Sequence, residues 1–139
     1  MVRRWRVQGI LLLVLVAPAA LATSPDPAEG VRAAEAWLKL IDDGQYGASW
    51  DASAAMFKAA VTRTEWVRQA GAVRVPLGKM LSRKLLSSQL AHALPGAPDG
   101  TYVVVVYQTR FEHKEQARET VTVALDPGER FRGTGYFIR

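Results

Sequence analysis

The sequence contains no cysteine among its 139 residues. This absence excludes disulfide bonds, zinc sites with thiolate ligands, a cysteine nucleophile and thioether lipidation. It contains only two histidines, His92 and His113, which lie too far apart in sequence to form a helical metal-binding pair of the H-x-x-x-H kind. We therefore expect no metal site and no cofactor, and we expect both histidines to be exposed.

Two common catalytic signatures are also missing. No serine stands in a G-x-S-x-G nucleophile elbow, and the glycines are scattered at turns instead of forming a phosphate-binding loop. We interpret Ser49, Ser53 and Ser82 as helix-surface or capping residues. The sequence therefore predicts no catalytic residue.

The N-terminus has the three-part pattern of a secretory signal peptide. Three arginines at positions 3–6 precede an almost unbroken apolar run over 7–16, and Ala-Leu-Ala at 20–22 offers small residues for cleavage. Residues 1–22 are thus predicted to be removed, leaving an exported protein that is periplasmic or extracellular. An uncleaved membrane anchor is the alternative, but the apolar stretch is shorter than the roughly 20 residues that a span requires. We expect no stable membrane span after cleavage.

Charge makes nucleic acid a poor partner. The chain carries 18 basic and 13 acidic residues, a net charge of +5. Cleavage would remove three arginines, so that 15 basic residues face 13 acidic ones and the net charge falls to +2. A nearly balanced, exported protein does not have the basic excess typical of nucleic-acid binding.

The stretch TYVVVVYQTRF, residues Thr101–Phe111, predicts the central strand of an antiparallel sheet. Its β-branched and aromatic side chains suit a pleated, buried surface. Because the four valines are not interrupted by a polar residue, we expect both faces of this strand to contact other protein.

Three helices are predicted before this strand. Residues 23–30 form a flexible leader, and a single domain occupies 31–139. The first helix has Asp26 as N-cap and Pro27 in its first turn, and it runs to about Asp43. The others span about Tyr46–Ala60 and, after a capping box at Thr62 and Glu65, Arg63–Val73.

Three further strands are predicted at Ser82–Leu94, Thr120–Leu125 and Phe131–Ile138, and residues 112–116 form a charged connector. Which side of the last strand faces inward is left open, although its two glycines would let a helix or ligand approach the backbone. The resulting fold class is α+β, with three N-terminal helices packed on one face of a four-stranded antiparallel meander sheet.

Four segments of the chain have a recognisable pattern, namely AWLKLIDDGQYGASWDASAAMFK, RVPLG, LPGAPDGTYVVVVYQTRF and the terminal GYFIR. They resemble a known bacterial family, the domain of unknown function numbered 4019, and the resemblance covers about 31–139. It implies a small exported protein whose fold is similar to the cone-shaped nuclear transport factor 2-like or cystatin-like domains. It implies no known activity, and no catalytic residue transfers.

Aromatic side chains provide the candidate binding site. If the helical and sheet halves converge, their rings can line an apolar pocket with tyrosine hydroxyls as polar groups and an arginine at its mouth. The alternative is a packed core, with Arg110 paired to Glu119 on the adjacent strand. The candidate ligand-binding residues are Trp37, Tyr46, Trp50, Trp66, Tyr107, Arg110 and Tyr136.

We predict an exported, non-enzymatic domain that binds a small apolar ligand or a protein partner through the helix–sheet cleft or an exposed sheet face. A hydratase, isomerase or hydrolase is the first alternative, with Asp51 or Asp42 as general base and Tyr46 or Tyr107 orienting the substrate. A dimeric envelope scaffold is the second, in which two copies pair through the open sheet face.

Overall fold

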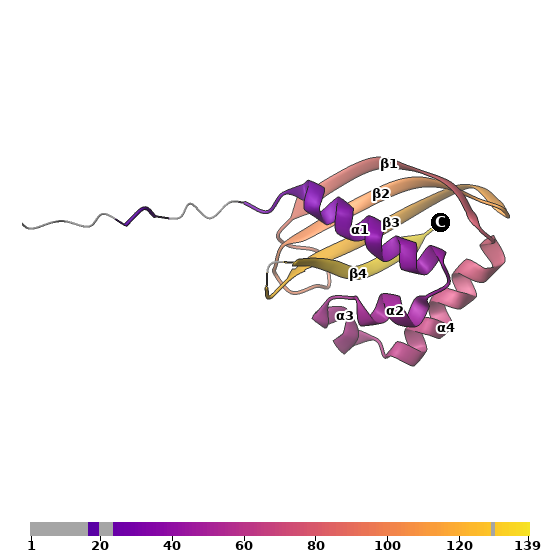
Figure 1. The fold of residues 1–139 in the computed structure, drawn as a ribbon, viewed down its shortest axis with the longest axis horizontal. Helices are drawn as coiled ribbons and strands as arrows, with labels where there is room; N and C mark the ends of the chain where they lie inside the picture. Colours follow the sequence, from indigo (N-terminus) through magenta and orange to yellow (C-terminus); the bar gives the residue numbers. More distant parts are fainter. Residues whose placement is uncertain (1–16, 20–23, 129) are drawn as a thin grey trace, which may run out of the picture.

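The computed structural model describes residues 17–19, 24–128 and 130–139. Four α-helices precede four β-strands, and α1 lies across the sheet, as Figure 1 shows. This order and the antiparallel meander β1-β2-β3-β4 confirm the predicted α+β class. Most of the predicted signal peptide lies outside these residues. Within the described ranges, we find no helix with the length and apolar character needed to cross a membrane.

Helix α1 (Pro27–Asp42) forms where its sequence predicts it. The carboxylate of Asp26 accepts a hydrogen bond from the Ala28 N–H at 2.9 Å, and Pro27 occupies the first turn. Thus α1 includes the last four residues assigned to the leader. Its buried face includes Ala34, Trp37, Leu38 and Ile41, the stripe expected from the helical period.

The prediction of a single helix over 46–60 is wrong. Two short helices occupy this segment, α2 (Tyr46–Asp51) and α3 (Ala55–Ala60). Between them Ala54 is fully buried, and its N–H donates to the Gly133 carbonyl of β4 at 2.8 Å. A tertiary hydrogen bond therefore takes the place of a helical one, which local sequence periodicity does not reveal.

Helix α4 (Arg63–Arg74) has Thr62 as its N-cap, as the capping-box pattern predicts. It leads through the short 3₁₀ helix η1 (Val75–Leu77) into the sheet. Helix α2 packs against both α1 and α4, and α1 lies over the inner face of the sheet. Arg74 at the end of α4 reaches Asp42 at the end of α1.

The strands are β1 (Met80–Ala91), β2 (Tyr102–Phe111), β3 (Lys114–Asp126) and β4 (Arg130–Ile138). The charged connector predicted over 112–116 is wrong, because β3 begins at Lys114 and only Glu112 and His113 form the turn. Both histidines are exposed, as expected.

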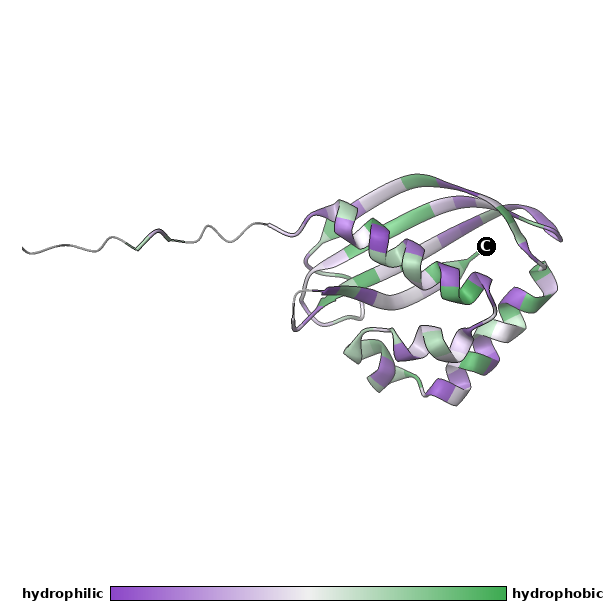
Figure 2. Ribbon diagram, viewed as in Figure 1, coloured by the Kyte–Doolittle hydropathy of each residue, from purple (hydrophilic) through white to green (hydrophobic). Residues whose placement is uncertain are grey.

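The sheet has an inner face toward α1 and an open face on the other side. On β2, Val103, Val105 and Tyr107 are buried on the inner face, whereas Val104 and Val106 alternate onto the open face and are only half-buried. Hydrophobic segments of the sheet are visible beneath α1 in Figure 2. The prediction that both faces of β2 contact other protein is therefore wrong beyond Tyr102, whose open-face side chain is buried against Ala54, Met56 and the β1–β2 loop.

The last strand changes sides at an irregularity in its pairing with β3, between Thr122 and Val123. Phe131 and Gly133 face inward before it, whereas Tyr136 faces inward after it. A Cβ on Gly133 would collide with the indole ring of Trp37. The expectation that a glycine admits a helix to the backbone is confirmed at this position.

Candidate functional site

The aromatic residues predicted to line a pocket pack against one another. The rings of Trp37 and Trp66 stack with their centroids 5.7 Å apart, and Phe57 meets both edge-on. Tyr136 packs edge-on against Trp37 from β4 at 6.4 Å. Tyr46 and Trp50 lie against the same hydrophobic core. The structure thus brings six of the seven predicted residues into one core, and only Arg110 lies outside it. The six are Trp37, Tyr46, Trp50, Trp66, Tyr107 and Tyr136.

The polar groups of the indoles are used inside the protein. Trp37 Nε1 donates to the Ser49 carbonyl at 2.8 Å, and Trp66 Nε1 donates to the Ser49 hydroxyl at 2.8 Å. Trp50 Nε1 donates to the Val61 carbonyl at 2.8 Å. Ser49 and Ser53 are buried in this arrangement, so their interpretation as helix-surface residues is wrong. The three indole N–H groups are therefore not left for a ligand.

A buried network of charges lies beside the aromatic cluster, where α1, α4, β1 and β3 meet. Arg83 donates to Asp42 at 2.7 and 3.0 Å and to Glu119 at 2.8 and 3.2 Å. Arg74 donates to Asp42 at 2.8 Å. Glu119 is completely buried, and Arg74 is 4% exposed. Two arginines and two carboxylates balance, so the network is neutral overall.

Hydroxyl groups complete the shell of Glu119. Thr109 donates to its carboxylate at 2.5 Å, and Tyr136 donates to the other carboxylate oxygen. Arg110 takes no part, because Glu119 pairs with Tyr107 across the strands and points to the inner face. The predicted Arg110–Glu119 pair is thus wrong. In the described part of the chain the Tyr107 hydroxyl is buried without a hydrogen-bond partner.

The electrostatics of Asp42 and Asp51 do not favour either carboxylate as a general base. Burial would raise the pKa of Asp42, but hydrogen bonds and charges from Arg83 and Arg74 outweigh it and hold that pKa below its ordinary value. Asp51 is exposed, and its hydrogen bond to Arg63 also lowers its pKa. Burial and the nearby Glu35 raise the pKa of Tyr107 to about 12. Neither aspartate has the raised pKa that the enzyme hypothesis requires.

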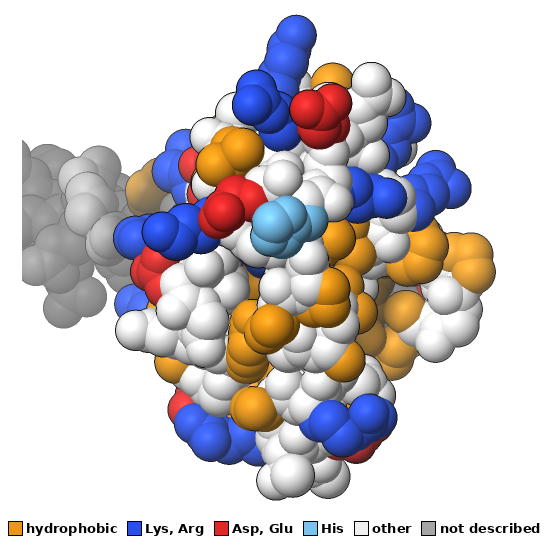
Figure 3. Space-filling view, turned by 90° about the vertical axis from the view of Figure 1, so that its right-hand side faces the viewer, with side chains coloured by type: hydrophobic (Ala, Val, Ile, Leu, Met, Phe, Trp, Pro, Cys, Tyr) orange, Lys and Arg blue, Asp and Glu red, His pale blue; other side chains and the backbone are white. Residues whose placement is uncertain are grey.

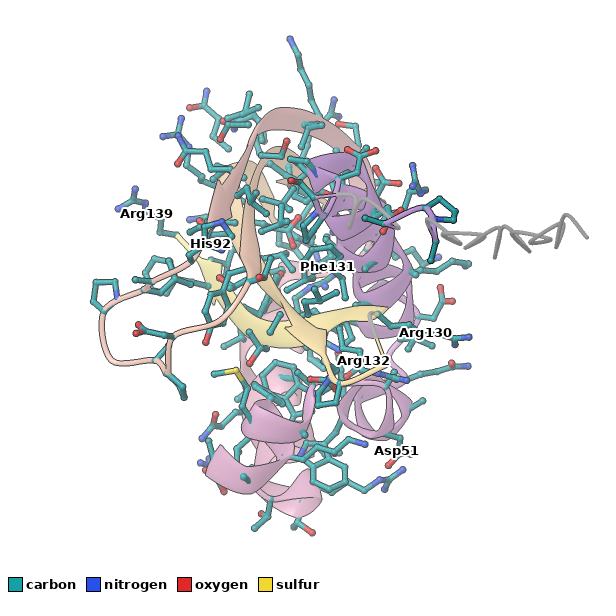
Figure 4. The ribbon with its side chains drawn as sticks, turned by 90° about the vertical axis from the view of Figure 1, so that its left-hand side faces the viewer. Asp51, His92, Arg130, Phe131, Arg132 and Arg139 are labelled. Carbon is teal, nitrogen blue, oxygen red and sulfur yellow. The ribbon has the colours of Figure 1, made fainter. Side chains whose placement is uncertain are left out.

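Two hollows flank α1. A hollow of 230 Å³ toward β4 has an apolar lining that includes Trp37 and Phe131, with Arg130 and Arg132 beside it. Figure 4 shows these two arginines near the start of β4. A hollow of 540 Å³ toward β1 is lined mainly by charged side chains that include Asp42 and Arg83. Of the seven predicted binding residues, only Trp37 lines either hollow.

The open face carries an apolar strip across three strands. Its two rows follow from the strand register, in which Val104 pairs with Thr122 and Val106 pairs with Thr120. Phe137 on β4 pairs with Thr120 and is 59% exposed. We define the apolar strip as Val104, Val106, Thr120, Thr122 and Phe137. At one end of the sheet, Tyr102 and Ala124 on this face are buried against the β1–β2 loop and against Ala54 and Met56. In the strip itself Phe137 is exposed, and the other four side chains are half-buried.

Four basic side chains lie beside this strip. Lys84, Gln108 and Arg118 are paired across β1, β2 and β3, and reciprocal backbone hydrogen bonds of 2.8 and 3.1 Å place Arg139 opposite Arg118. Arg110 lies further along β2 on the same face. We call Lys84, Arg110, Arg118 and Arg139 the basic band. Figure 4 shows Arg139 on the side of the sheet away from α1.

A family model described as a protein of unknown function, DUF4019, matches residues 33–136. The chain belongs to the DUF4019 family. Comparisons with curated proteins and with solved structures gave no match. The resemblance noted in the sequence is therefore confirmed for this DUF4019 domain, and its function has to be inferred from its own surfaces.

Sequence reasoning missed the charge network and the basic band. Arg83 and Glu119 lie 36 positions apart, and Arg118 and Arg139 are brought together only by the pairing of β3 with the C-terminal residues. A signal was present in the alternation of β3, where a glutamate shares a face with Val121 and Val123. A charged residue on the apolar face of a strand requires a buried partner.

Proposed function

We propose that this DUF4019 protein is an exported, non-enzymatic domain that binds a protein partner across the open face of its sheet. The observation that carries this proposal is the apolar strip on the open face, which ends at Phe137 with 59% of that residue's surface exposed. Exposed apolar patches rimmed by polar residues are typical of interaction sites.

The hydrogen bonds inside the protein indicate that the buried indole rings and carboxylates have a structural role. The indole N–H groups bond to backbone and serine oxygens, and Asp42 and Glu119 are held by arginines. An interior that is packed and internally hydrogen-bonded favours the protein-partner form of the binding hypothesis over a small ligand held among the aromatic rings.

The shape of the open face also suits a protein. Four strands spaced about 4.8 Å apart present a surface roughly 14 Å wide across the sheet. A broad surface of this kind matches the size of a protein interface better than the concave pocket that small molecules occupy.

Photocrosslinking tests this proposal. A photoreactive amino acid is placed at Thr122 in the apolar strip, and a matched control is placed at Ala72, an exposed position on α4. In the native host we expect a crosslink from Thr122 to a second protein species and none of that mass from Ala72. A crosslink only between two copies of the chain would support the dimeric scaffold, and equal products from both positions would contradict the proposal.

A small ligand in the helix–sheet cleft is the second candidate. The hollow between α1 and β4 favours it, since apolar side chains form its lining and Arg130 and Arg132 flank it. Native mass spectrometry of the exported protein tests both this candidate and cleavage. A mass of residues 23–139 with a discrete adduct would support both, and a bare mass would favour the open face.

A further inference from the structure

The basic band forms a continuous feature although its members come from four segments. Lys84, Arg118 and Arg139 occupy one row across the sheet, with Gln108 between the first two. At strand spacings of about 4.8 Å, this row is roughly 14 Å long. Figure 3, which views the end near the β2–β3 turn, shows Lys and Arg side chains over its upper part, with acidic side chains and a histidine between them.

The band is not neutralised by the residues that the structure describes. Its four side chains are exposed and take part in none of the ion pairs between described residues. By contrast, Arg74 and Arg83 on the helix side of the sheet form ion pairs with carboxylates. The positive charge of the sheet is thus balanced on the inner face and left free on the open face.

A hollow of 510 Å³ lies at this end of the sheet. Its lining includes Lys84 and Arg110 from the basic band, together with the side-chain amides of Gln108 and Gln116. Glu115 is the carboxylate in the lining. The two cations and two amides provide hydrogen-bond donors for carboxylates, which bind most strongly to charged donors.

Charge complementarity distinguishes between possible occupants. A second copy placed on the apolar strip would bury apolar surface but would bring another four cations with it. A partner segment with carboxylates next to apolar side chains would contact the strip and neutralise the band. Complementary charge of this kind speeds association and selects the partner.

We propose that the basic band is the docking site for an acidic, partly apolar segment of the partner protein. This inference rests on the proposed function, because it names the chemistry of the partner that the open face binds. Apolar side chains of the segment lie on the apolar strip, and its carboxylates lie beside Lys84, Arg110, Arg118 and Arg139.

A defined peptide tests the charge requirement. The probe is a fluorescein-labelled dodecapeptide in which glutamates alternate with valine and phenylalanine, and fluorescence anisotropy measures its binding to the purified protein. A peptide with lysine at every glutamate position is the control. We expect binding of the acidic peptide only, with an affinity that falls as salt concentration rises.

Charge-reversal variants localise that binding. Lys84→Glu combined with Arg118→Glu should weaken binding about tenfold, because two attractions become repulsions. Arg32→Glu combined with Lys58→Glu changes the net charge equally on the helical layer, and we expect less than about a twofold change. Equal losses in both variants, or no peptide binding at physiological salt, would overturn the proposal.

The same variants separate this inference from the proposed function. If the Thr122 crosslink persists in the Lys84→Glu, Arg118→Glu variant, an acidic segment is not required but the open face still binds a protein. If the unsubstituted protein gives no Thr122 crosslink, the proposed function itself fails. Binding to phosphatidylglycerol vesicles without peptide binding would overturn the inference in favour of a membrane surface.

Discussion

The two faces of the sheet use charge in opposite ways. On the inner face, Arg83 joins Asp42 and Glu119 in a neutral network that the helices cover. On the open face, four cations lie exposed beside the half-buried valines and threonines of the apolar strip and the exposed Phe137. Burying a charge requires a partner, whereas an exposed charge requires none. The difference indicates that the inner charges maintain the fold and the outer charges are available for recognition.

The largest expected effect comes from opening the buried network. Arg83→Ala leaves Asp42 with Arg74 alone and removes both charge-assisted bonds from Glu119. We predict a loss of about 3–5 kcal/mol in the free energy of unfolding, measured by urea denaturation. Arg110→Ala on the open face is the control, with an expected change below about 0.5 kcal/mol. Similar losses in the two variants would remove the distinction between the faces.

The two glycines of β4 offer a matched pair across the sheet. A methyl group on Gly133 meets the Trp37 ring, whereas one on Gly135 lies 3.5 Å from Thr122, an ordinary contact. We predict that Gly133→Ala costs about 1–3 kcal/mol of stability through overpacking and that Gly135→Ala costs much less. Thermal unfolding of both variants checks this, and an equal shift in Tm would be the contrary result.

Acidic pH should lower the free energy of unfolding, because protonation of Asp42 weakens its ion pairs with Arg74 and Arg83 on the inner face. Its folded-state pKa lies below the ordinary value of 3.8, so its contribution is fully present above that pH and is lost as the pH falls through the folded value. We predict that unfolding free energy decreases below about pH 4 and that Asp42→Asn flattens this decrease. Denaturation of both proteins at neutral and acidic pH checks the prediction, and parallel curves would contradict it.

The smallest effect on stability should come from the apolar strip. Phe137 is more than half exposed, so Phe137→Ser should change the free energy of unfolding by less than about 1 kcal/mol. The same substitution should reduce partner crosslinking from Thr122 because it removes apolar contact area. A variant that unfolds at much lower urea would show that Phe137 belongs to the core.

Local patterns predicted local structure well. The cap at Asp26, the stripe through Trp37 and Leu38, and the cap at Thr62 were all readable from the sequence. The α+β order followed from these elements and the valine-rich strand. Each prediction depended on residues within a few positions of one another, where helical period and capping chemistry apply.

The errors have a common cause in long-range pairing. The helix break at Ala54 depends on a carbonyl of β4, and the partner of Glu119 depends on which face of β3 carries it. The basic band depends on register that aligns Lys84 with Arg139 through two other strands. None of these relations follows from residues adjacent in sequence. The net charge of the chain therefore did not predict that four cations would lie together on one face of the sheet.

Crosslinking from Thr122 in the unsubstituted protein and in Val106→Asp tests the functional division between the faces most directly. Val106 is half-buried on the open face, so an aspartate there disrupts the apolar strip. We predict a crosslink to a second protein that disappears in Val106→Asp while circular dichroism shows the variant folded. An undiminished crosslink in a folded Val106→Asp variant would contradict the assignment of the open face as the binding surface.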